Sequence, residues 1–221
     1  MQPLVDGQSL GAAGHHAKKK SLIASERLTE RIAELRRRFI ERQTALDTSK
    51  LIFIDEAGSN VAMTREHAWA PRGQRVVDDV PRNRGTVTTI LGALCITGIV
   101  SVMTVEGATD SEVFCAFLEH VLGPKLKPGD VLVLDNVGAH RTADVRRLVE
   151  KMGAKVLFLP PYSPDLNPIE ECWSKVKSLL RKFGPRTRED LDFALAGACS
   201  SVTPGDARGW ITHSGYLCGA N

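Results

Sequence analysis

The apolar positions near the start of the chain follow the period of a helix. From residue 25 onward they recur at spacings of four, three and four, and several arginines lie between them. The apolar positions are Leu28, Ile32, Leu35 and Phe39. This spacing predicts an amphipathic helix over residues 25–46, with one apolar face and the arginines on the opposite face.

Strand-like runs follow this helix. Residues 51–57 (LIFIDEA) are a short apolar run that ends on two acids, and turn residues occupy 58–60, so we expect a strand that delivers Asp55 to its end. Two further β-rich runs, 86–96 and 98–106, meet at Thr97 and Gly98. This arrangement predicts a tight antiparallel hairpin.

In the second half of the chain, helical and strand patterns alternate. A helix is predicted from residue 110 until Gly123 and Pro124 stop it, then a buried strand over 131–135, a helix over 142–152 and another buried strand over 155–159. A proline-rich loop then leads to a helix that runs to residue 183. Antiparallel strands followed by β-α-β-α units predict an α/β fold with a mixed sheet flanked by helices.

Composition narrows the class of protein. The 221 residues are 43% apolar, enough for one sizeable core with a small appendage. The five cysteines include no C-x-x-C pair, which predicts reduced thiols, and the glycine-rich loops of nucleotide-cofactor enzymes are absent. No run has the length of a membrane span and no secretory signal begins the chain, so we expect a cytoplasmic protein without a membrane partner.

Basic residues are concentrated in one segment, although the net charge is only +3. Residues 18–42 hold nine lysines and arginines against four glutamates. This excess fits contacts to DNA phosphates, and a solvated helix face explains it equally well. The candidates for DNA binding are Lys18, Lys19, Lys20, Arg36, Arg37 and Arg38.

Three acidic residues stand where the predicted elements would bring them together. Asp55 and Asp135 each end a predicted strand and Glu170 opens a predicted helix, so their carboxylates should meet at one edge of the sheet. Three carboxylates repel one another unless cations hold them, and a pair of magnesium ions bound by such oxygens can catalyse phosphodiester displacement. Local sequence leaves other roles open, because either aspartate suits a turn and Glu170 suits a reciprocal helix cap with Asn167.

Three segments resemble the acidic blocks of Tc/mariner superfamily transposases, in their bacterial insertion-sequence branch (insertion sequence 630 type). They are DEAG at 55–58, DNVGAH at 135–140 and LPPYSPDLNPIEECWSKVK at 159–177. The 34 residues between Asp135 and Glu170 (136–169) match the separation in D,D,E members of the superfamily, which favours Glu170 over Glu171. The likeness runs from about Leu10 to Tyr216 and implies the ribonuclease H-like fold of DDE transposase and integrase catalytic cores.

The resemblance implies a DDE-type transposase, a metal-dependent endonuclease and DNA strand transferase. Asp55, Asp135 and Glu170 would be its catalytic residues and would bind two Mg²⁺ or Mn²⁺ ions. The enzyme would cut double-stranded DNA at the ends of its element and join the freed 3′-hydroxyl to target DNA, usually at TA, and relatives act as homodimers. Asn136 and His140 match the pattern D-N-x-x-x-H and would orient metal ligands or phosphate, although His140 also suits a hydrogen bond in the core.

The resemblance also divides the chain. Residues 1–48 would be a lead-in and basic helix, the remnant that follows a missing helix-turn-helix region, and residues 49–221 would be the catalytic domain. Recognition of the element ends would then need a separate upstream helix-turn-helix chain, acting with this one at the bacterial nucleoid. One alternative is a truncated, non-catalytic regulator that binds DNA or dimerises. A more distant one is a ribonuclease H-like nuclease of repair or RNA processing.

Overall fold

The computed structural model describes residues 23–219 and is built on a five-stranded mixed sheet in the order β3-β2-β1-β4-β5. β1 (Leu51–Ser59), β2 (Thr88–Cys95) and β3 (Gly98–Glu106) are antiparallel neighbours. β4 (Val131–Leu134) and β5 (Lys155–Phe158) continue the sheet parallel to β1. The predicted hairpin and the predicted mixed α/β sheet are therefore confirmed.

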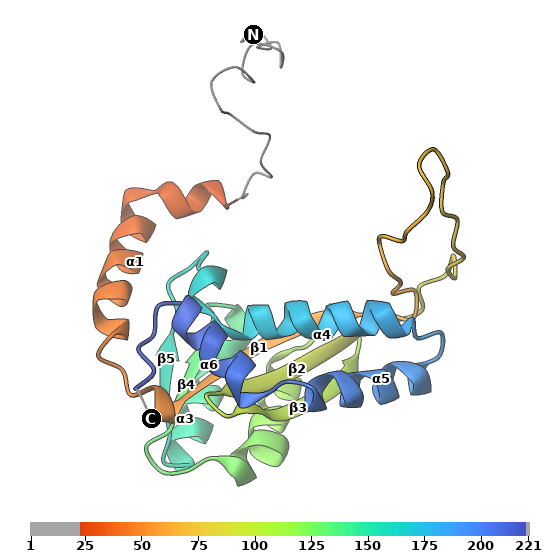
Figure 1. Cartoon of the computed structure of the whole chain (residues 1–221). Coiled ribbons are helices and arrows are strands. Elements are labelled where there is room, and N and C mark those ends of the chain that lie inside the picture. The colour runs from red at the N-terminus through yellow and green to blue at the C-terminus, as the bar shows by residue number, and fades with distance from the viewer. Residues whose placement is uncertain (1–22, 220–221) are drawn as a thin grey trace, which may run out of the picture.

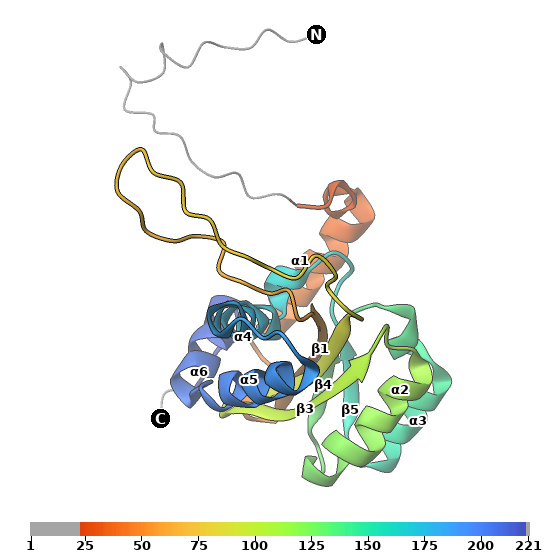
Figure 2. The ribbon, with the colours of Figure 1, turned by 90° about the vertical axis from the view of Figure 1, so that its right-hand side faces the viewer.

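Helices cover both faces of this sheet (Figures 1 and 2). One face carries α2 (Ser111–Ala116), which continues as a π segment (Phe117–Leu122) and a 3-10 turn (Gly123–Lys125), together with α3 (Ala143–Lys151). The other face carries α4 (Ile169–Phe183), α5 (Arg188–Ser200) and α6 (Pro204–His213). Among residues 23–219, no helix combines the length and the apolar character that a membrane span needs.

The two-residue period of β1 divides the core into two layers. Phe53 and Ala57 pack in the cluster that contains the apolar residues of α4, α5 and α6. Ile52 and Ile54 point the other way, into the cluster that contains those of α2 and α3. Asp55 has the parity of Phe53, so its side chain belongs to the face that α4 covers.

β1 runs to Ser59, two residues beyond the predicted run 51–57, so Asp55 lies inside the strand and not at its end. Antiparallel pairing with β2 continues along this extension, from Asp55 opposite Gly92 to Ser59 opposite Thr88. The ladder hydrogen bonds thus override the turn tendency of Gly58 and Ser59. Residues 60–87 then form a long irregular excursion before β2, drawn in gold in Figure 1, on which Trp69 is fully exposed.

The N-terminal helix α1 (Glu30–Gln43) confirms the predicted helix but not its predicted buried face. Leu28 and Leu35 are 72% and 39% exposed. The buried side chains of the helix are Ile32, Arg36 and Gln43. Arg36 is drawn inward because its guanidinium donates two hydrogen bonds to Asp165, of 3.1 and 2.8 Å. A contact with a residue so distant in sequence was not visible in the spacing of apolar residues.

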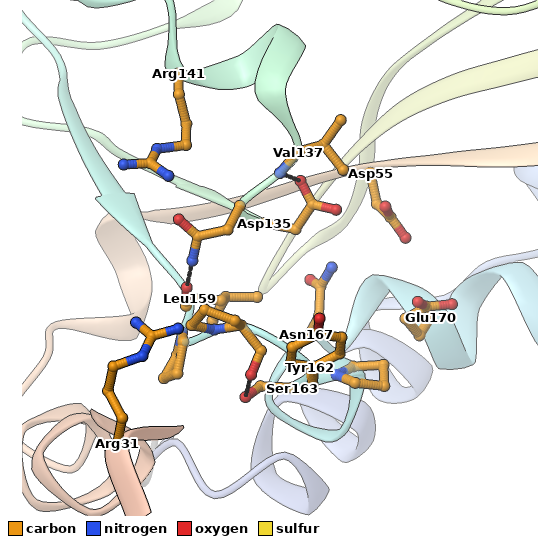
Figure 3. A pocket seen from close by; sticks show the side chains of 14 residues that line it. Arg31, Asp55, Asp135, Val137, Arg141, Leu159, Tyr162, Ser163, Asn167 and Glu170 are labelled. Atoms are coloured by element: carbon orange, nitrogen blue, oxygen red, sulfur yellow. Dashed lines mark hydrogen bonds between the residues drawn. The ribbon is translucent and has the colours of Figure 1, made fainter. Parts of the chain in front are cut away.

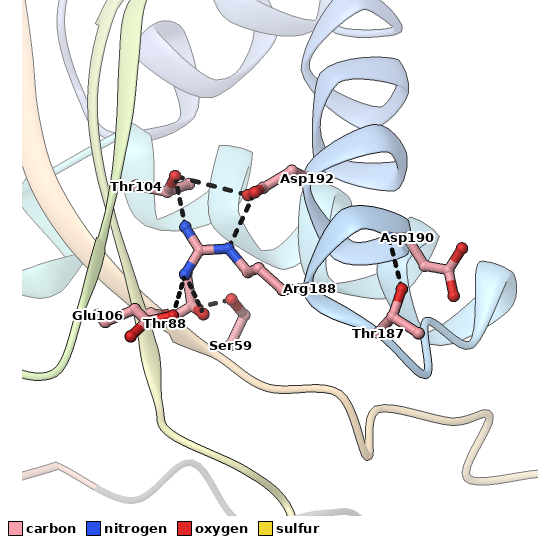
Figure 4. A network of polar contacts seen from close by, with 8 residues as sticks. All are labelled: Ser59, Thr88, Thr104, Glu106, Thr187, Arg188, Asp190 and Asp192. Carbon is pink, nitrogen blue, oxygen red and sulfur yellow. Dashed lines mark hydrogen bonds and ion pairs between the residues drawn. The ribbon is translucent and has the colours of Figure 1, made fainter.

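Helix α5 is attached to the strand edge by one arginine at its start (Figure 4). The Arg188 guanidinium donates to Thr104 Oγ1 on β3 at 3.0 Å and to Thr88 Oγ1 on β2 at 3.4 Å. It also lies 3.3 Å from a Glu106 carboxylate oxygen and 2.9 Å from one of Asp192. This network fixes the covering layer against β2 and β3.

Candidate active site

Strand register brings Asp55 and Asp135 to the same place. β1 and β4 are parallel, and Leu51, Ile52 and Phe53 pair with Val131, Leu132 and Val133, each 80 residues further along. The same offset sets Asp55 level with Asp135, which follows directly after β4 ends at Leu134. Because residues at equal register in parallel strands point to the same face, both carboxylates face the layer of α4.

Glu170 reaches this face from the first turn of α4. The helix begins at Ile169 after Pro168, and no side chain caps its first backbone N–H groups. The Asn167 Oδ1 atom is buried without a hydrogen-bond partner among the described residues. The reciprocal cap between Asn167 and Glu170 that the sequence allowed is therefore absent, and the Glu170 carboxylate is not occupied by capping.

Three side chains, those of Arg27, Arg36 and Tyr216, hold the loop before α4. Asp165 binds Arg36 and also lies 2.9 Å from Arg27 Nη2. The buried Tyr216 hydroxyl donates to the Leu166 carbonyl at 2.9 Å. Tyr162 adopts a left-handed backbone conformation (φ 55°), which is uncommon for a residue other than glycine and is found more often at functional sites.

The three acidic residues line one pocket of about 490 Å³ (Figure 3). The proline-rich loop forms one wall, and Asn136 and Val137 form part of another. Two arginines, Arg31 from α1 and Arg141 from the turn after β4, also line the pocket. The neighbouring acids Glu56 and Glu171 do not line it, which agrees with the choice of Glu170 that the resemblance favoured.

Mutual repulsion and burial disfavour three negative charges in this pocket. Burial, together with the charges of Glu170 and Asp135, raises the pKa of Asp55 to about 7. Burial and the charge of Asp135 also raise the pKa of Glu170, although Lys177 opposes them. Asp135 differs, because hydrogen bonds from His140 and from the Val137 N–H outweigh its burial and lower its pKa.

His140 and Asn136 support Asp135 from behind. His140 Nδ1 lies 2.7 Å from Asp135 Oδ1, and its Nε2 lies 3.5 Å from Glu56 Oε1. Burial opposes the charged imidazole, but these two carboxylates outweigh it and raise the pKa of His140 to about 9. The Asn136 side-chain amide donates to the Leu159 carbonyl, which ties the end of β4 to the end of β5. His140 also packs in the core, with its ring centroid 4.1 Å from that of Phe114, so it combines a core position with the contact to Asp135.

The donor set suits hard divalent cations, since the pocket offers three carboxylates and neither a thiolate nor an imidazole lines it. A bound cation would also offset the repulsion that raises the pKa values of Asp55 and Glu170. Within residues 23–219, however, no three acidic, histidine or cysteine side chains are close enough together to bind one ion as they stand. Binding by all three carboxylates would require side-chain rearrangement.

The predicted DNA-binding residues are distributed differently. Lys18, Lys19 and Lys20 lie outside the described residues. Arg36 is buried and paired with Asp165, while Arg37 and Arg38 are exposed and paired with Glu34 or Glu41. Arg31 and Arg141, which do line the pocket, were missed. They are 110 residues apart (31 and 141), and only the fold shows that they share a pocket with the acids.

A family model and several solved structures match this chain. The family model described as "DDE superfamily endonuclease" matches residues 50–192. Among solved structures, a Mos1 mariner paired end complex with Mn matches with a TM-score of 0.76 at 18% identity, over 94% of this chain and 66% of that chain. The Mos1 transposase catalytic domain with Raltegravir and Mn matches with a TM-score of 0.65 at 16% identity, over 85% of this chain and 91% of that one.

These likenesses confirm the ribonuclease H-like fold that the sequence resemblance implied. The chain spans slightly less than two thirds of the Mos1 chain in the paired-end complexes, 66% of its length. A comparison with curated proteins gives no match.

Proposed function

Because the chain belongs to the DDE superfamily endonucleases, we propose that it is the catalytic part of a Tc/mariner-type transposase. It cleaves DNA at the ends of its own element and joins the freed ends to target DNA. The observation that supports this proposal most is that Asp55, Asp135 and Glu170, from three separate elements, line one pocket. Paired-end and strand-transfer complexes of the structurally similar Mos1 transposase support it further.

In this proposal, Asp55, Asp135 and Glu170 are the catalytic residues and hold two Mg²⁺ or Mn²⁺ ions. Such ions, when bound, make water a better nucleophile and stabilise the leaving oxygen. His140 positions Asp135 through their 2.7 Å contact, and Asn136 fixes the chain next to it through Leu159. The buried Trp173 fixes α4 against the sheet, and with it Glu170.

The reaction proceeds in two displacements at phosphorus. A water oxygen first attacks a phosphodiester at the element end, the bond from phosphorus to the 3′ oxygen breaks, and a 3′-hydroxyl and a 5′-phosphate result. The 3′ oxygen then attacks a phosphodiester of the target, and a target 3′-hydroxyl leaves. Neither step needs an oxidant or a reductant, so divalent ions and DNA are sufficient.

The partner in this proposal is double-stranded DNA, with TA as target, and two copies of the chain act together on two element ends. The likeness to bacterial insertion-sequence transposases favours a nucleoid location. In the same interpretation, residues 49–221 are the catalytic domain and residues 1–48 precede it, although Arg36 of α1 contacts Asp165 of the catalytic part. Light scattering of the chain with and without DNA would test the dimer.

Strand cleavage tests the proposal directly. The substrate is a labelled duplex that carries the inverted repeat flanking the gene, with Mn²⁺ or Mg²⁺ and a plasmid as target. We expect cleavage that leaves a 3′-hydroxyl, followed by joining to the plasmid, and we expect Asp135→Asn to abolish both. Asp144→Asn is the matched control, because Asp144 is an exposed acid on α3 that pairs with Arg147 and does not line the pocket. Cleavage undiminished in Asp135→Asn would exclude the assigned site, and no cleavage by the wild-type chain would favour the non-catalytic regulator.

A further inference from the structure

We propose that Arg31 and Arg141 together bind a DNA phosphate in the carboxylate pocket. This inference rests on the proposed function and adds to it the residues that would hold the substrate. Both side chains line the same pocket as Asp55, Asp135 and Glu170. In Figure 3 they approach from opposite sides, Arg31 from α1 and Arg141 from the turn after β4. A phosphate bound by both would lie in the pocket that the acidic residues line.

The two guanidinium groups are free to bind a ligand. Among residues 23–219, neither makes a hydrogen bond or an ion pair, and both residues are exposed. The other arginines near them on α1 differ: Arg36 binds Asp165, and Arg37 and Arg38 bind Glu34. A guanidinium stays charged at any working pH and offers a planar fork of donors that matches phosphate oxygens.

The pocket needs positive charge before it can bind a phosphate, and these two arginines supply it. Three carboxylates line the pocket, and together they repel an incoming phosphodiester. Metal ions at the acids would offset part of this repulsion, and the arginines at the pocket wall would offset a further part. Their positive charge lies at the wall of the pocket that the acids line, where it attracts a DNA backbone.

Arg31 is fixed at the pocket by the residues on either side of it in sequence. Arg27 and Arg36 both bind Asp165 on the proline-rich loop that forms a pocket wall. Further along α1, the Gln43 side-chain amide donates to the Ser214 carbonyl at 3.1 Å. These contacts set the rotation and position of α1, so Arg31 is presented to the pocket without needing a partner of its own.

Arg141 is fixed by its sequence neighbour. His140 is buried and contacts both Asp135 and Glu56, and its N–H donates to the Val137 carbonyl at 3.1 Å. The 3-10 turn Gly138–Arg141 is therefore anchored at the residue before Arg141. Both arginines thus combine a fixed backbone with an unpaired side chain, as expected of groups held ready for a substrate.

Salt-dependent DNA binding tests this assignment without requiring cleavage. Binding of a fluorescein-labelled 30-base-pair duplex is measured by anisotropy in EDTA, between 50 and 300 mM KCl, for the wild type and for Arg31→Gln, Arg141→Gln and the double variant. We expect each single variant to weaken binding roughly tenfold at low salt and to reduce the slope of log Kd against log [KCl] by about 1. Because the two arginines share one phosphate, the double variant should lose less than the two single losses combined, and additive losses would contradict the sharing.

Arg208→Gln is the matched control, because Arg208 is an exposed arginine on α6 that does not line the pocket. Equal melting temperatures would show that all variants fold. If Arg31→Gln and Arg141→Gln bind DNA with the same affinity and salt slope as Arg208→Gln, the assignment is wrong. Cleavage by the wild-type chain with Mn²⁺ is scored separately, so failure of the proposed function and failure of this inference give different results.

Discussion

Replacing Gly92 by alanine should destabilise the protein and impair its site together. Gly92 lies on β2 opposite Asp55, and a Cβ atom built on it would come 2.4 Å from Trp173 Cη2 and 2.8 Å from Trp173 Cζ2. Carbon atoms in good contact are about 3.5 to 4.0 Å apart, so the overlap exceeds 1 Å. Trp173 is 2% exposed and lies on α4, three residues after Glu170, so the indole cannot move without its helix.

The size of the effect follows from two opposing contributions. Overpacking a closed core costs about 1 to 3 kcal/mol, and this overlap with a rigid ring belongs at the upper end. Alanine in place of glycine inside a strand restores about 0.5 to 1 kcal/mol through backbone entropy. We therefore expect a net loss of about 2 kcal/mol in the free energy of unfolding, or a fall in melting temperature of about 4 to 8 °C.

Urea unfolding measures this loss, and Gly58→Ala is the control on the neighbouring strand. A Cβ atom at Gly58 would meet only Val87 Cγ1 at 3.7 Å, an ordinary contact. Trp173→Phe provides the second test, because a smaller ring makes room for the added methyl group. In a double-mutant cycle, Gly92→Ala should cost at least about 1 kcal/mol less in the Trp173→Phe background. Unchanged stability of Gly92→Ala, or additive losses in the cycle, would refute the reasoning.

Three further predictions concern the contacts around the site. Burial opposes ionisation of Asp165, but the hydrogen bonds and charge of Arg36 outweigh burial and lower the pKa of Asp165. The stability that the charged carboxylate contributes is therefore present at neutral pH, and it is lost as the pH falls through the folded-state pKa. Asp165→Asn should therefore lower the free energy of unfolding by about 1 to 2 kcal/mol at pH 7, a modest loss because the Asp165 side chain is 43% exposed. The difference in stability from the wild type should shrink below about pH 4. A difference that stays constant with pH would contradict this. Asp55→Asn removes a buried charge from an acidic pocket, so in EDTA its melting temperature should equal or exceed that of the wild type. Mn²⁺ should raise the melting temperature of the wild type alone. Equal stabilisation of both proteins by Mn²⁺ would count against Asp55 as a ligand. Tyr216→Phe leaves the Leu166 carbonyl without its 2.9 Å donor and should cost about 1 kcal/mol, seen as a fall of about 2 to 4 °C in calorimetry; no change would mean that water replaces the hydroxyl.

The sequence predicted the sheet well because each strand coincides with an apolar run in its own segment of the chain. The apolar runs at 131–135 and 155–159 correspond to β4 and β5, and the two runs around Thr97 correspond to the β2-β3 hairpin. Asp55 and Asp135, in the runs 51–57 and 131–135, could therefore be placed on strands of one sheet before the fold was known. The helix of Glu170 was likewise predictable from the proline at its start.

Contacts between distant residues account for what the patterns could not predict. The buried face of α1 depends on Arg36 meeting Asp165, and the length of β1 beyond Asp55 depends on its ladder with β2. The cap at Asn167 was wrong because its side chain does not reach the first turn of α4. Arg31 and Arg141 carry no motif at all, so only their common pocket indicates a role.

The segment from the end of α1 to β1 contacts the C-terminal tail, which limits how the protein can be divided into fragments. Gln43 and Thr48 hydrogen-bond the carbonyls of Ser214 and Leu217, and Gly215 leaves no room for a Cβ atom beside Gln43 Nε2. All of these residues lie outside the family-matched segment 50–192. An expression fragment trimmed to that segment would lack both partners of these hydrogen bonds. It would also lack the Tyr216 hydroxyl, which supports the loop before Glu170. Biochemical work should therefore keep α1 and the C-terminal tail in one polypeptide.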